Sequence, residues 1–473
     1  VRVVPEAFRL FSHIFTVDNY VFIHNNSYNK GMAKTFAAQV NRLPSDPSLS
    51  AALEFLCRVS NSLYNCTTYL ARQVYFKEKK YANKFWLATE MKRNPHMKAL
   101  YTSAAQQTCF SVGEAFKGFK ELRKLWFQGE LPDEPKAPNY RKSGGRFQLS
   151  YPKRWLKLTD KGVRVAMGTA CKVWFGLREI FIPFPSNLDW ATVKELQIVP
   201  RAGYFDAVWV SAADAPEKPE LDPNKALSID QGVDNWLTCT PSDAEAFIID
   251  GKQLKAVNQF YNKQVANIKR DKAQDFWCRL LDRLTTKRNR QMRDAVNKAA
   301  RQGVNYCVAN QIGVVVFGWN KGQKNKANMG RKTNQKFVQI PTAKLKKRIS
   351  QLCELYGIEF TPQEESYTSK ASALDLDVIP VFGAKPEGWK PSGTKPKRGL
   401  YKSADGTRIN ADCNGAWNIG RKANVTGMQC KPASGQLTSP RRLRIWSLRT
   451  SRLAEVLKPL TEAGESPVLQ SRE

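Results

Sequence analysis

Residues 226–240 constrain the fold of this 473-residue chain more than any other segment. A short apolar run up to Ile229 ends at Asp230, and a Gln-Gly turn leads into a second β-prone run that begins at Asn235. This pattern predicts two strands joined by a tight turn. Asp230 then has two interpretations: it caps the turn, as Asp commonly does, or it is a metal ligand held at the end of a buried strand. The rest of the sequence has to decide between them.

Two later acidic segments favour the metal site. Glu364 and Glu365 follow a short predicted strand over residues 358–361, and Asp412 stands at the start of an amphipathic helix. These acids are far from Asp230 along the chain, so only a fold could bring them together. The prediction is therefore three-dimensional.

Together the three segments resemble the RuvC nuclease domain, which is RNase H-like, of the TnpB proteins of bacterial insertion sequences and of their descendants, the type V CRISPR effectors. The resemblance is dense from about residue 226 to residue 422. It implies that Asp230, one glutamate and Asp412 are the catalytic residues and the ligands of two Mg²⁺ ions. Such ions generate a nucleophile from water and neutralise the leaving oxygen in phosphodiester hydrolysis, and Mg²⁺ prefers oxygen ligands.

The glutamate departs from the commoner pattern of this family. In most relatives it ends the central strand, in a segment like Val-Ile-Glu-Asp-Leu-Asn, whereas residues 315–320 here read Val-Val-Phe-Gly-Trp-Asn, with Phe317 in place of the acid. Either the nuclease is inactive or another carboxylate fills the vacancy. A subgroup of TnpB relatives resembles this chain in having Gly-Trp-Asn-Lys here and Glu-x-Tyr-Thr-Ser-Lys further on, which implies a relocated glutamate from the adjacent strand. That register selects Glu365, with Glu364 as the alternate and Glu359 as a more distant one.

The charge of the chain predicts a nucleic-acid partner. Lys and Arg number 75 against 42 Asp and Glu, a formal net charge of +33, and such a surface attracts a polyanion. An anionic membrane is the competing partner, but no apolar run approaches the roughly 18 residues of a spanning helix and no signal peptide is evident. Residues 313–348 hold ten Lys or Arg and no acid, which favours phosphate contacts over a solvated loop. The predicted nucleic-acid contacts are Lys287, Arg288, Arg290, Lys321, Lys324, Lys326, Arg331, Lys332, Tyr367 and Lys370.

Cysteine and histidine usage predicts the absence of zinc. The ten Cys include no Cys-x-x-Cys pair, and the three His all lie in the first hundred residues. The pattern argues against a zinc ribbon, a disulfide scaffold and an HNH nuclease, and it suits a reducing cytoplasm; the resemblance implies a prokaryote and a place at its nucleoid. Where many relatives carry zinc-binding Cys pairs, about residues 371–400 are rich in Pro, Gly and Lys. We expect either a flexible lid without zinc or a loop without function.

Hydrophobic periodicity predicts an α+β multidomain chain. Apolar residues recur at helical spacing over residues 53–77 and 103–127, and β-prone runs separated by turns, one of them at 173–177, fill residues 146–213. The resemblance implies a β-barrel wedge domain with a helical recognition domain inserted into it, followed by the RuvC-like nuclease domain. The predicted boundaries are 1–45 for the segment that starts the wedge domain, 46–131 for the recognition domain, 132–222 for the β-barrel wedge domain, 223–430 for the nuclease domain and 431–473 for a mobile basic tail.

The sequence therefore predicts an RNA-guided, Mg²⁺-dependent DNA endonuclease with a single RuvC site. The guide RNA and the double-stranded target DNA are the expected partners, with a short flanking motif read on the duplex, and the guide requirement comes entirely from the resemblance. The oligomeric state stays open. A catalytically silent RNA-guided DNA-binding protein, acting as a repressor or transposon-associated factor, is the alternative, and an unguided structure-specific nuclease is a weaker one.

Overall fold

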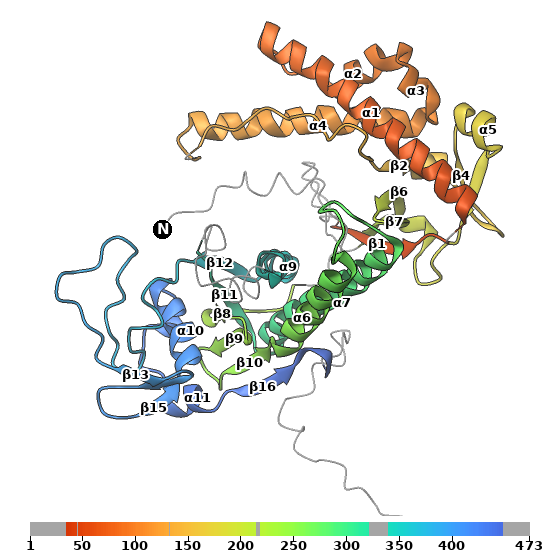
Figure 1. The fold of residues 1–473 in the computed structure, drawn as a ribbon. Helices are drawn as coiled ribbons and strands as arrows, with labels where there is room; N and C mark the ends of the chain where they lie inside the picture. The colour runs from red at the N-terminus through yellow and green to blue at the C-terminus, as the bar shows by residue number, and fades with distance from the viewer. Residues whose placement is uncertain (1–34, 45, 132, 214–217, 321–338, 448–473) are drawn as a thin grey trace, which may run out of the picture. The chain divides into compact units, whose positions relative to one another are not determined.

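The computed structural model describes residues 35–44, 46–131, 133–213, 218–320 and 339–447. The chain divides into two compact units, residues 1–215 and 216–473, each with its own core. Figure 1 shows the helices and strands of both units. None of the helices in the described ranges is long and apolar enough to cross a membrane.

The first unit contains a helical module built on two long helices. α1 (Pro47–Glu78) and α4 (Thr102–Phe127) pack through buried apolar side chains, and α2 (Lys84–Glu90) and α3 (Pro95–Ala99) lie between them in sequence. α1 begins where Asp46 accepts hydrogen bonds from the backbone N–H groups of Ser48, at 2.8 Å, and Leu49. Because these N–H groups have no partner within the helix, the cap fixes where α1 starts.

Two antiparallel sheets complete the first unit. One has the order β1-β7-β6-β2 and the other the order β3-β4-β5, and both contribute side chains to one core. The strands are β1 (Thr35–Arg42), β2 (Leu149–Pro152), β3 (Lys157–Thr159), β4 (Gly162–Ala166), β5 (Glu179–Ile182), β6 (Val193–Arg201) and β7 (Tyr204–Ala213). The assignment of this unit to wedge and recognition domains stays a prediction.

One predicted strand of the first unit is wrong. Residues 173–177 fall largely within α5 (Thr169–Phe175), a helix of two turns. Gly168 and Gly176 flank it with φ angles of 90° and 69°, and the Gly176 N–H donates to the Lys172 carbonyl at 3.0 Å. The β-prone composition of the segment was a weaker signal than the two glycines that delimit it, since glycine adopts a left-handed helix end at little cost.

The second unit is organised around a mixed six-stranded sheet with the order β12-β11-β8-β9-β10-β16. β8 and β9 form an antiparallel hairpin, while β8, β11 and β12 run parallel. Every residue of β11 is buried, as expected for a central parallel strand. The strands are β8 (Asp222–Gln231), β9 (Asn235–Pro241), β10 (Phe247–Asp250), β11 (Ile312–Gly318), β12 (Glu359–Gln363) and β16 (Arg441–Arg444).

Helices cover both faces of this sheet (Figure 1). α7 (Arg279–Ala309) and α9 (Thr342–Tyr356) pack in one core with Leu227 and Ile229 of β8. α10 (Ala411–Lys422) packs in the other core with Ala226. Successive side chains of β8 thus alternate between the two cores, which assigns each residue of the strand to one face. α6 (Lys252–Lys269) precedes α7 and packs against it.

The C-terminal segment differs from the expected mobile tail over residues 431–447. α11 (Ser434–Thr438) is followed by β16, which pairs in parallel with β10 and forms one edge of the sheet. The Arg441 N–H donates to the Ala246 carbonyl at 3.0 Å, and Leu443 and Ile445 pack against the core. Their alternation with basic residues is a strand pattern that the Arg-rich composition masked. Residues 448–473 lie outside the described part of the chain.

The space around two helical glycines, Gly420 of α10 and Gly303 of α7, predicts opposite effects on stability for the same substitution to Ala. In Gly420→Ala, the new methyl group would overlap the Met428 sulfur and lie 3.2 Å from the Ser228 Cβ, so that side chains must shift. We expect lower stability, because overpacking typically costs about 1–3 kcal/mol. In Gly303→Ala of α7 nothing lies within 4 Å, so the helix should gain up to about 1 kcal/mol from the better helix former. Urea denaturation of both variants checks the contrast, and equal shifts would contradict it.

Candidate active site

Asp230 lies at the end of β8 on the face covered by α10. Two residues earlier, the Ser228 hydroxyl donates to the Ala416 carbonyl of α10 at 2.5 Å. Strand alternation sends Asp230 toward the same helix, where a Cβ built on Gly415 would lie 3.2 Å from the Asp230 Oδ2. The absence of a side chain at Gly415 therefore leaves room for this carboxylate.

Asp412 occupies the first turn of α10. The Asn410 side chain caps the helix by accepting from the N–H groups of Asp412, at 2.9 Å, and Cys413. The Asp412 Oδ2 accepts a hydrogen bond of 2.5 Å from the Asn235 amide, at the start of β9. That amide is oriented in turn by Arg442 of β16, which donates to the Asn235 Oδ1 at 2.9 Å. A local helix cap and the Asn235 amide, itself oriented by Arg442, thus fix the position of Asp412.

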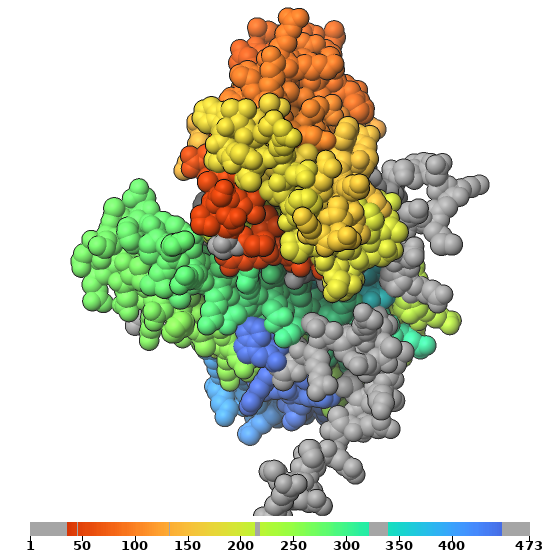
Figure 2. Space-filling view, turned by 90° about the vertical axis from the view of Figure 1, so that its right-hand side faces the viewer, coloured from red at the N-terminus to blue at the C-terminus, as the bar shows by residue number. Residues whose placement is uncertain are grey.

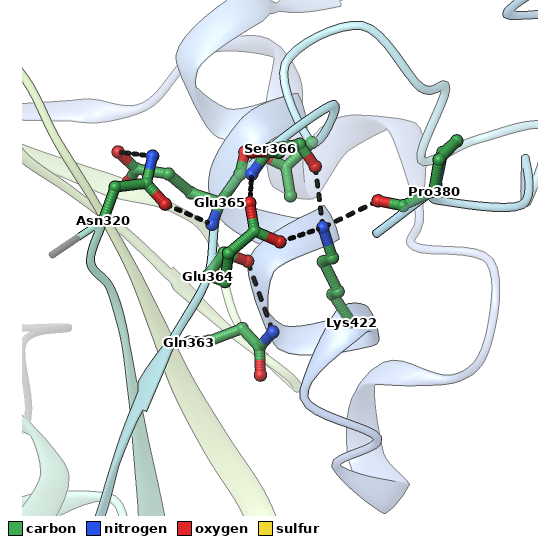
Figure 3. Close-up of polar contacts among 8 residues, drawn as sticks. Asn320, Gln363, Glu364, Glu365, Ser366, Pro380 and Lys422 are labelled. Carbon is green, nitrogen blue, oxygen red and sulfur yellow. Dashed lines mark hydrogen bonds and ion pairs between the residues drawn. The ribbon is translucent and has the colours of Figure 1, made fainter. Parts of the chain in front are cut away.

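Glu365 follows β12, next to the end of β11. A Cβ built on Gly318 would lie 2.8 Å from the Glu365 Oε2, so the side chain occupies the space that this glycine leaves. Asn320 holds the residue at two points: its Nδ2 donates to the Glu365 Oε1 at 3.1 Å, and its Oδ1 accepts from the Glu365 N–H at 3.2 Å (Figure 3). Glu364 turns the other way, toward Lys422.

The space that Glu365 fills lies at Gly318 and not at Phe317. Phe317 packs in the core with α7 and α9, where its ring centroid lies 6.2 Å from that of Phe360. Val316 packs in the other core, on the α10 side, and strand alternation then returns Gly318 to that side, where Asp230 lies. The vacancy that Glu365 fills is therefore at Gly318, and Phe317 is a core residue.

The three carboxylates are electrostatic neighbours. Burial raises the pKa of Asp230 well above its ordinary value, and the negative charges of Glu365 and Asp412 raise it further, while Lys395 lowers it. A low-dielectric environment and like charges both disfavour the ionised form. Asp230, Glu365 and Asp412 thus come together from β8, the turn after β12 and α10.

The chemistry of this donor set fits a hard divalent cation. Carboxylate oxygens are the ligands that Mg²⁺ prefers, and because Mg²⁺ keeps several waters, it does not need a closed protein cage. Over the described ranges, no three His, Cys, Asp or Glu side chains are set closely enough to hold an ion as they stand. Asp412 and Glu365 are instead hydrogen-bonded to Asn235 and Asn320.

The predicted nucleic-acid contacts differ in exposure and in their partners. Lys287, Arg290 and Lys370 are exposed, and α6 with the first part of α7 forms a protrusion of the second unit's surface (Figure 2, light green). Arg288 is half-buried and donates to the Asn258 Oδ1 at 2.8 Å, so it joins α7 to α6. The Tyr367 ring packs edge-on against that of Trp389. Outside the described residues lie Lys321, Lys324, Lys326, Arg331 and Lys332.

The predicted lid region follows the turn after Glu365 and leads through a small sheet into α10. Asp377 accepts from the N–H groups of Ser372, at 2.7 Å, and Ser392, which closes the loop between them. β13 (Thr394–Lys397), β14 (Leu400–Lys402) and β15 (Arg408–Asn410) then form a three-stranded sheet. We refer to residues 371–400 as the lid segment.

Sequence reasoning missed the residues that hold the carboxylates. Asn235, Asn320 and Arg442 donate or orient hydrogen bonds around Asp412 and Glu365. Only Asn320 carried a signal, since it belongs to the Gly-Trp-Asn-Lys segment that the resemblance had already singled out.

The raised pKa of Asp230 predicts that Asp230→Asn stabilises the metal-free protein at neutral pH. In the unfolded chain the Asp230 side chain has an ordinary pKa of about 3.9. Below that pH it is protonated in both the folded and the unfolded state, so its burial carries no electrostatic penalty. As pH rises, the unfolded chain releases a proton that the folded chain retains, so stability falls until the folded pKa is passed. At pH 7–8 in EDTA, the melting temperature of the variant should exceed that of wild type by about 2–4 °C for each kcal/mol of added unfolding free energy. This gain in melting temperature should shrink near pH 4. Asp222→Asn, at the other end of β8, is the control; a gain independent of pH would contradict the assignment.

Comparison with known proteins supports the resemblance that these segments predict. A family model described as a probable transposase, OrfB_IS605, matches residues 209–323. Among solved structures, the chain is similar to that of a Cas12f1-sgRNA-target DNA complex, with 15% identity, 79% of this chain and 83% of that chain covered, and a TM-score of 0.50. It is also similar to a CRISPR-Cas12f ternary complex, with 14% identity, 78% of this chain and 81% of that chain covered, and a TM-score of 0.31. None of the curated protein sequences matches the chain. The chain thus resembles the TnpB-like transposases and shares its fold with a miniature type V effector, as its sequence predicts.

Proposed function

We propose that this chain is an RNA-guided DNA endonuclease with one carboxylate active site in its second unit. The observation that carries the proposal is the meeting of Asp230, Glu365 and Asp412 at one edge of the sheet, where burial first and then the two neighbouring negative charges raise the pKa of Asp230. Strongly perturbed ionisable groups are concentrated at functional sites. A turn-capping role for Asp230 would not require two further acids from distant segments beside it.

Asp230, Glu365 and Asp412 are the residues that would hold two Mg²⁺ ions. When bound, the ions supply a nucleophile from water and neutralise charge on the leaving oxygen. The chain's own contribution is orientation: Asn235 and Asn320 hold Asp412 and Glu365 at fixed angles. Outer contacts of this kind commonly set the affinity of the ligands for their metal.

The proposed partners are a guide RNA and a double-stranded DNA target. The net charge of +33 suits two polyanions, and the Cas12f1 structure with the same fold is described as a complex with sgRNA and target DNA. In this proposal base pairing reads the target sequence, while the protein holds the backbone and reads a short flanking motif. The helices of the first unit act as the recognition domain and its sheets as the wedge domain, and the place of action is the prokaryotic nucleoid.

A catalytically silent RNA-guided DNA-binding protein is the second candidate. The observation that favours it is β11, whose end carries Phe317 and Gly318 and no acid. Against it stands Glu365, whose carboxylate fills the space that Gly318 leaves. A silent binder has no need of an acid there.

The first test removes the acids one at a time. Asp230→Ala, Glu365→Gln and Asp412→Ala should each reduce guide-dependent cleavage of target DNA with Mg²⁺ by about a thousandfold or more, because each supplies charge to the same ion pair. Target binding should persist. Cleavage and binding assays with the co-purified RNA measure the two properties separately.

Glu364→Gln is the matched control for Glu365→Gln, since it makes the same replacement of a carboxylate by an amide at the neighbouring glutamate. It should cut at a rate within about tenfold of wild type, because its side chain faces Lys422. Near-normal cleavage by Glu365→Gln would reject this residue as a catalytic group. A wild-type protein that binds its target and never cuts would favour the silent binder.

A further test addresses the exposed basic residues. If Lys287 and Lys370 contact phosphates, changing both to Ala should weaken nucleic-acid binding and reduce the slope of log K against log salt concentration. The reduction should reach about 0.9 for each lost duplex contact, or about 0.7 for a single strand. Arg288→Ala is the control, since its guanidinium bonds Asn258: the variant should lose stability and keep the slope. An unchanged slope in the double variant would mean that both lysines are merely solvated.

A further inference from the structure

Lys422 is a buried lysine at the end of the helix that begins beside Asp412. Its side chain is 6% exposed. The ammonium group donates to the Glu364 Oε2 at 2.5 Å and to the carbonyls of Ser366 and Pro380 at 2.8 Å each (Figure 3). These three acceptors match the three donors of an ammonium group, so its hydrogen-bonding capacity is fully used.

Both carboxylate oxygens of Glu364 accept a hydrogen bond. Its Oε2 accepts from Lys422, and its Oε1 accepts from the Ser366 N–H at 2.5 Å. On the other side of the same turn, Asn320 binds both the carboxylate and the backbone N–H of Glu365. Two adjacent glutamates are therefore drawn in opposite directions, one by Lys422 and the other by Asn320 (Figure 3).

The same end of α10 also holds the lid segment. Beside the Pro380 contact of Lys422, Arg421 donates to the Asp377 carbonyl at 3.1 Å. Between and after these two anchors the lid segment exposes apolar side chains, among them Val378, Val381 and Phe382. A shift of this backbone would remove one of the three acceptors of Lys422, which links the lid segment to the turn at Glu364.

We propose that Lys422 is a positioning residue that determines which of two adjacent glutamates faces the candidate active site. By binding Glu364 and the carbonyls of Ser366 and Pro380, it keeps Glu364 away from Asp230 and Asp412 and leaves Glu365 toward Gly318. The proposal rests on the proposed function, because it assigns Glu365 to the metal-binding side. It adds a residue that touches neither the substrate nor the metal and acts only through the turn.

The first experiment measures Mn²⁺ affinity, with Mn²⁺ as the probe, by electron paramagnetic resonance well below the melting temperature. Lys422→Met keeps the aliphatic stem and removes the three donors, and we expect its Mn²⁺ affinity to fall about 10–100-fold, as for other residues that orient metal ligands. Lys298→Met is the matched control, since Lys298 pairs with Asp294 at 3.0 Å on α7, far from the candidate site in sequence and element. Affinity within about twofold of wild type in Lys422→Met would overturn the proposal.

The second experiment tests the choice between the glutamates. In the wild-type background, Glu365→Gln should weaken Mn²⁺ binding far more than Glu364→Gln. In the Lys422→Met background, Glu364 is released, so the two substitutions should differ much less. A ratio of the two effects that is the same in both backgrounds would show that Lys422 does not select the glutamate.

Hydrogen exchange in EDTA separates this proposal from the proposed function. Lys422→Met should speed amide exchange at residues 364–368 and 377–382 together, with no metal or nucleic acid present, and Lys298→Met should not. If wild type binds no Mn²⁺ in an Asp230-dependent way, the proposed function fails, and the exchange result still decides the role of Lys422. Unchanged exchange in both segments would overturn it. Should Lys422→Met not fold, Lys422→Gln takes its place with the same expectations.

Discussion

The packing of α10 against β8 is the contact on which the candidate site depends. The two elements approach closely because small residues face each other along the contact: Ser228 bonds the α10 backbone, and Gly420 leaves room for Met428 beside it. The close approach brings Asp412, at the start of the helix, to the end of the strand that carries Asp230. Once both acids lie next to each other, their repulsion is a fixed cost of the fold, which binding of a cation would relieve.

The end of β11 carries no acid, and the packing around it explains how Glu365 takes that place. A central strand buried on both faces has no tolerance for an acid on its core side, and Phe317 fills that core. The neighbouring residue, Gly318, has no side chain and leaves space for a carboxylate. Glu365, which follows the parallel strand β12, reaches into this space. Parallel strands end at the same edge of a sheet. Either of two neighbouring strands can therefore carry the metal-binding carboxylate without a change of fold.

The sequence predicted the elements and the acids better than it predicted side-chain direction. Apolar periodicity and short β-branched runs predicted α1, α4, β8 and β11, because these elements are long or fully buried. The family motif predicted Glu365 and not its neighbour Glu364, because the motif places the glutamate two residues before Tyr367. The motif assigned the missing acid to Phe317, whereas the space that Glu365 fills lies at the next residue, Gly318, because a motif gives order along the chain and not the face of a strand. Asn235 and Arg442 could not be predicted, since a hydrogen bond between distant segments leaves no pattern in either of them.

The strand β16 has a consequence for shortening the chain. It pairs with β10 at one edge of the sheet, and from it Arg442 orients the amide that holds Asp412. A truncation or fusion placed at about residue 430, where the Asp412 helix has already ended, would expose the β10 edge as a template for intermolecular pairing. It would also leave the Asn235 amide without its orienting guanidinium. The shortest functional form of this protein is therefore limited by a strand that carries none of its proposed catalytic residues.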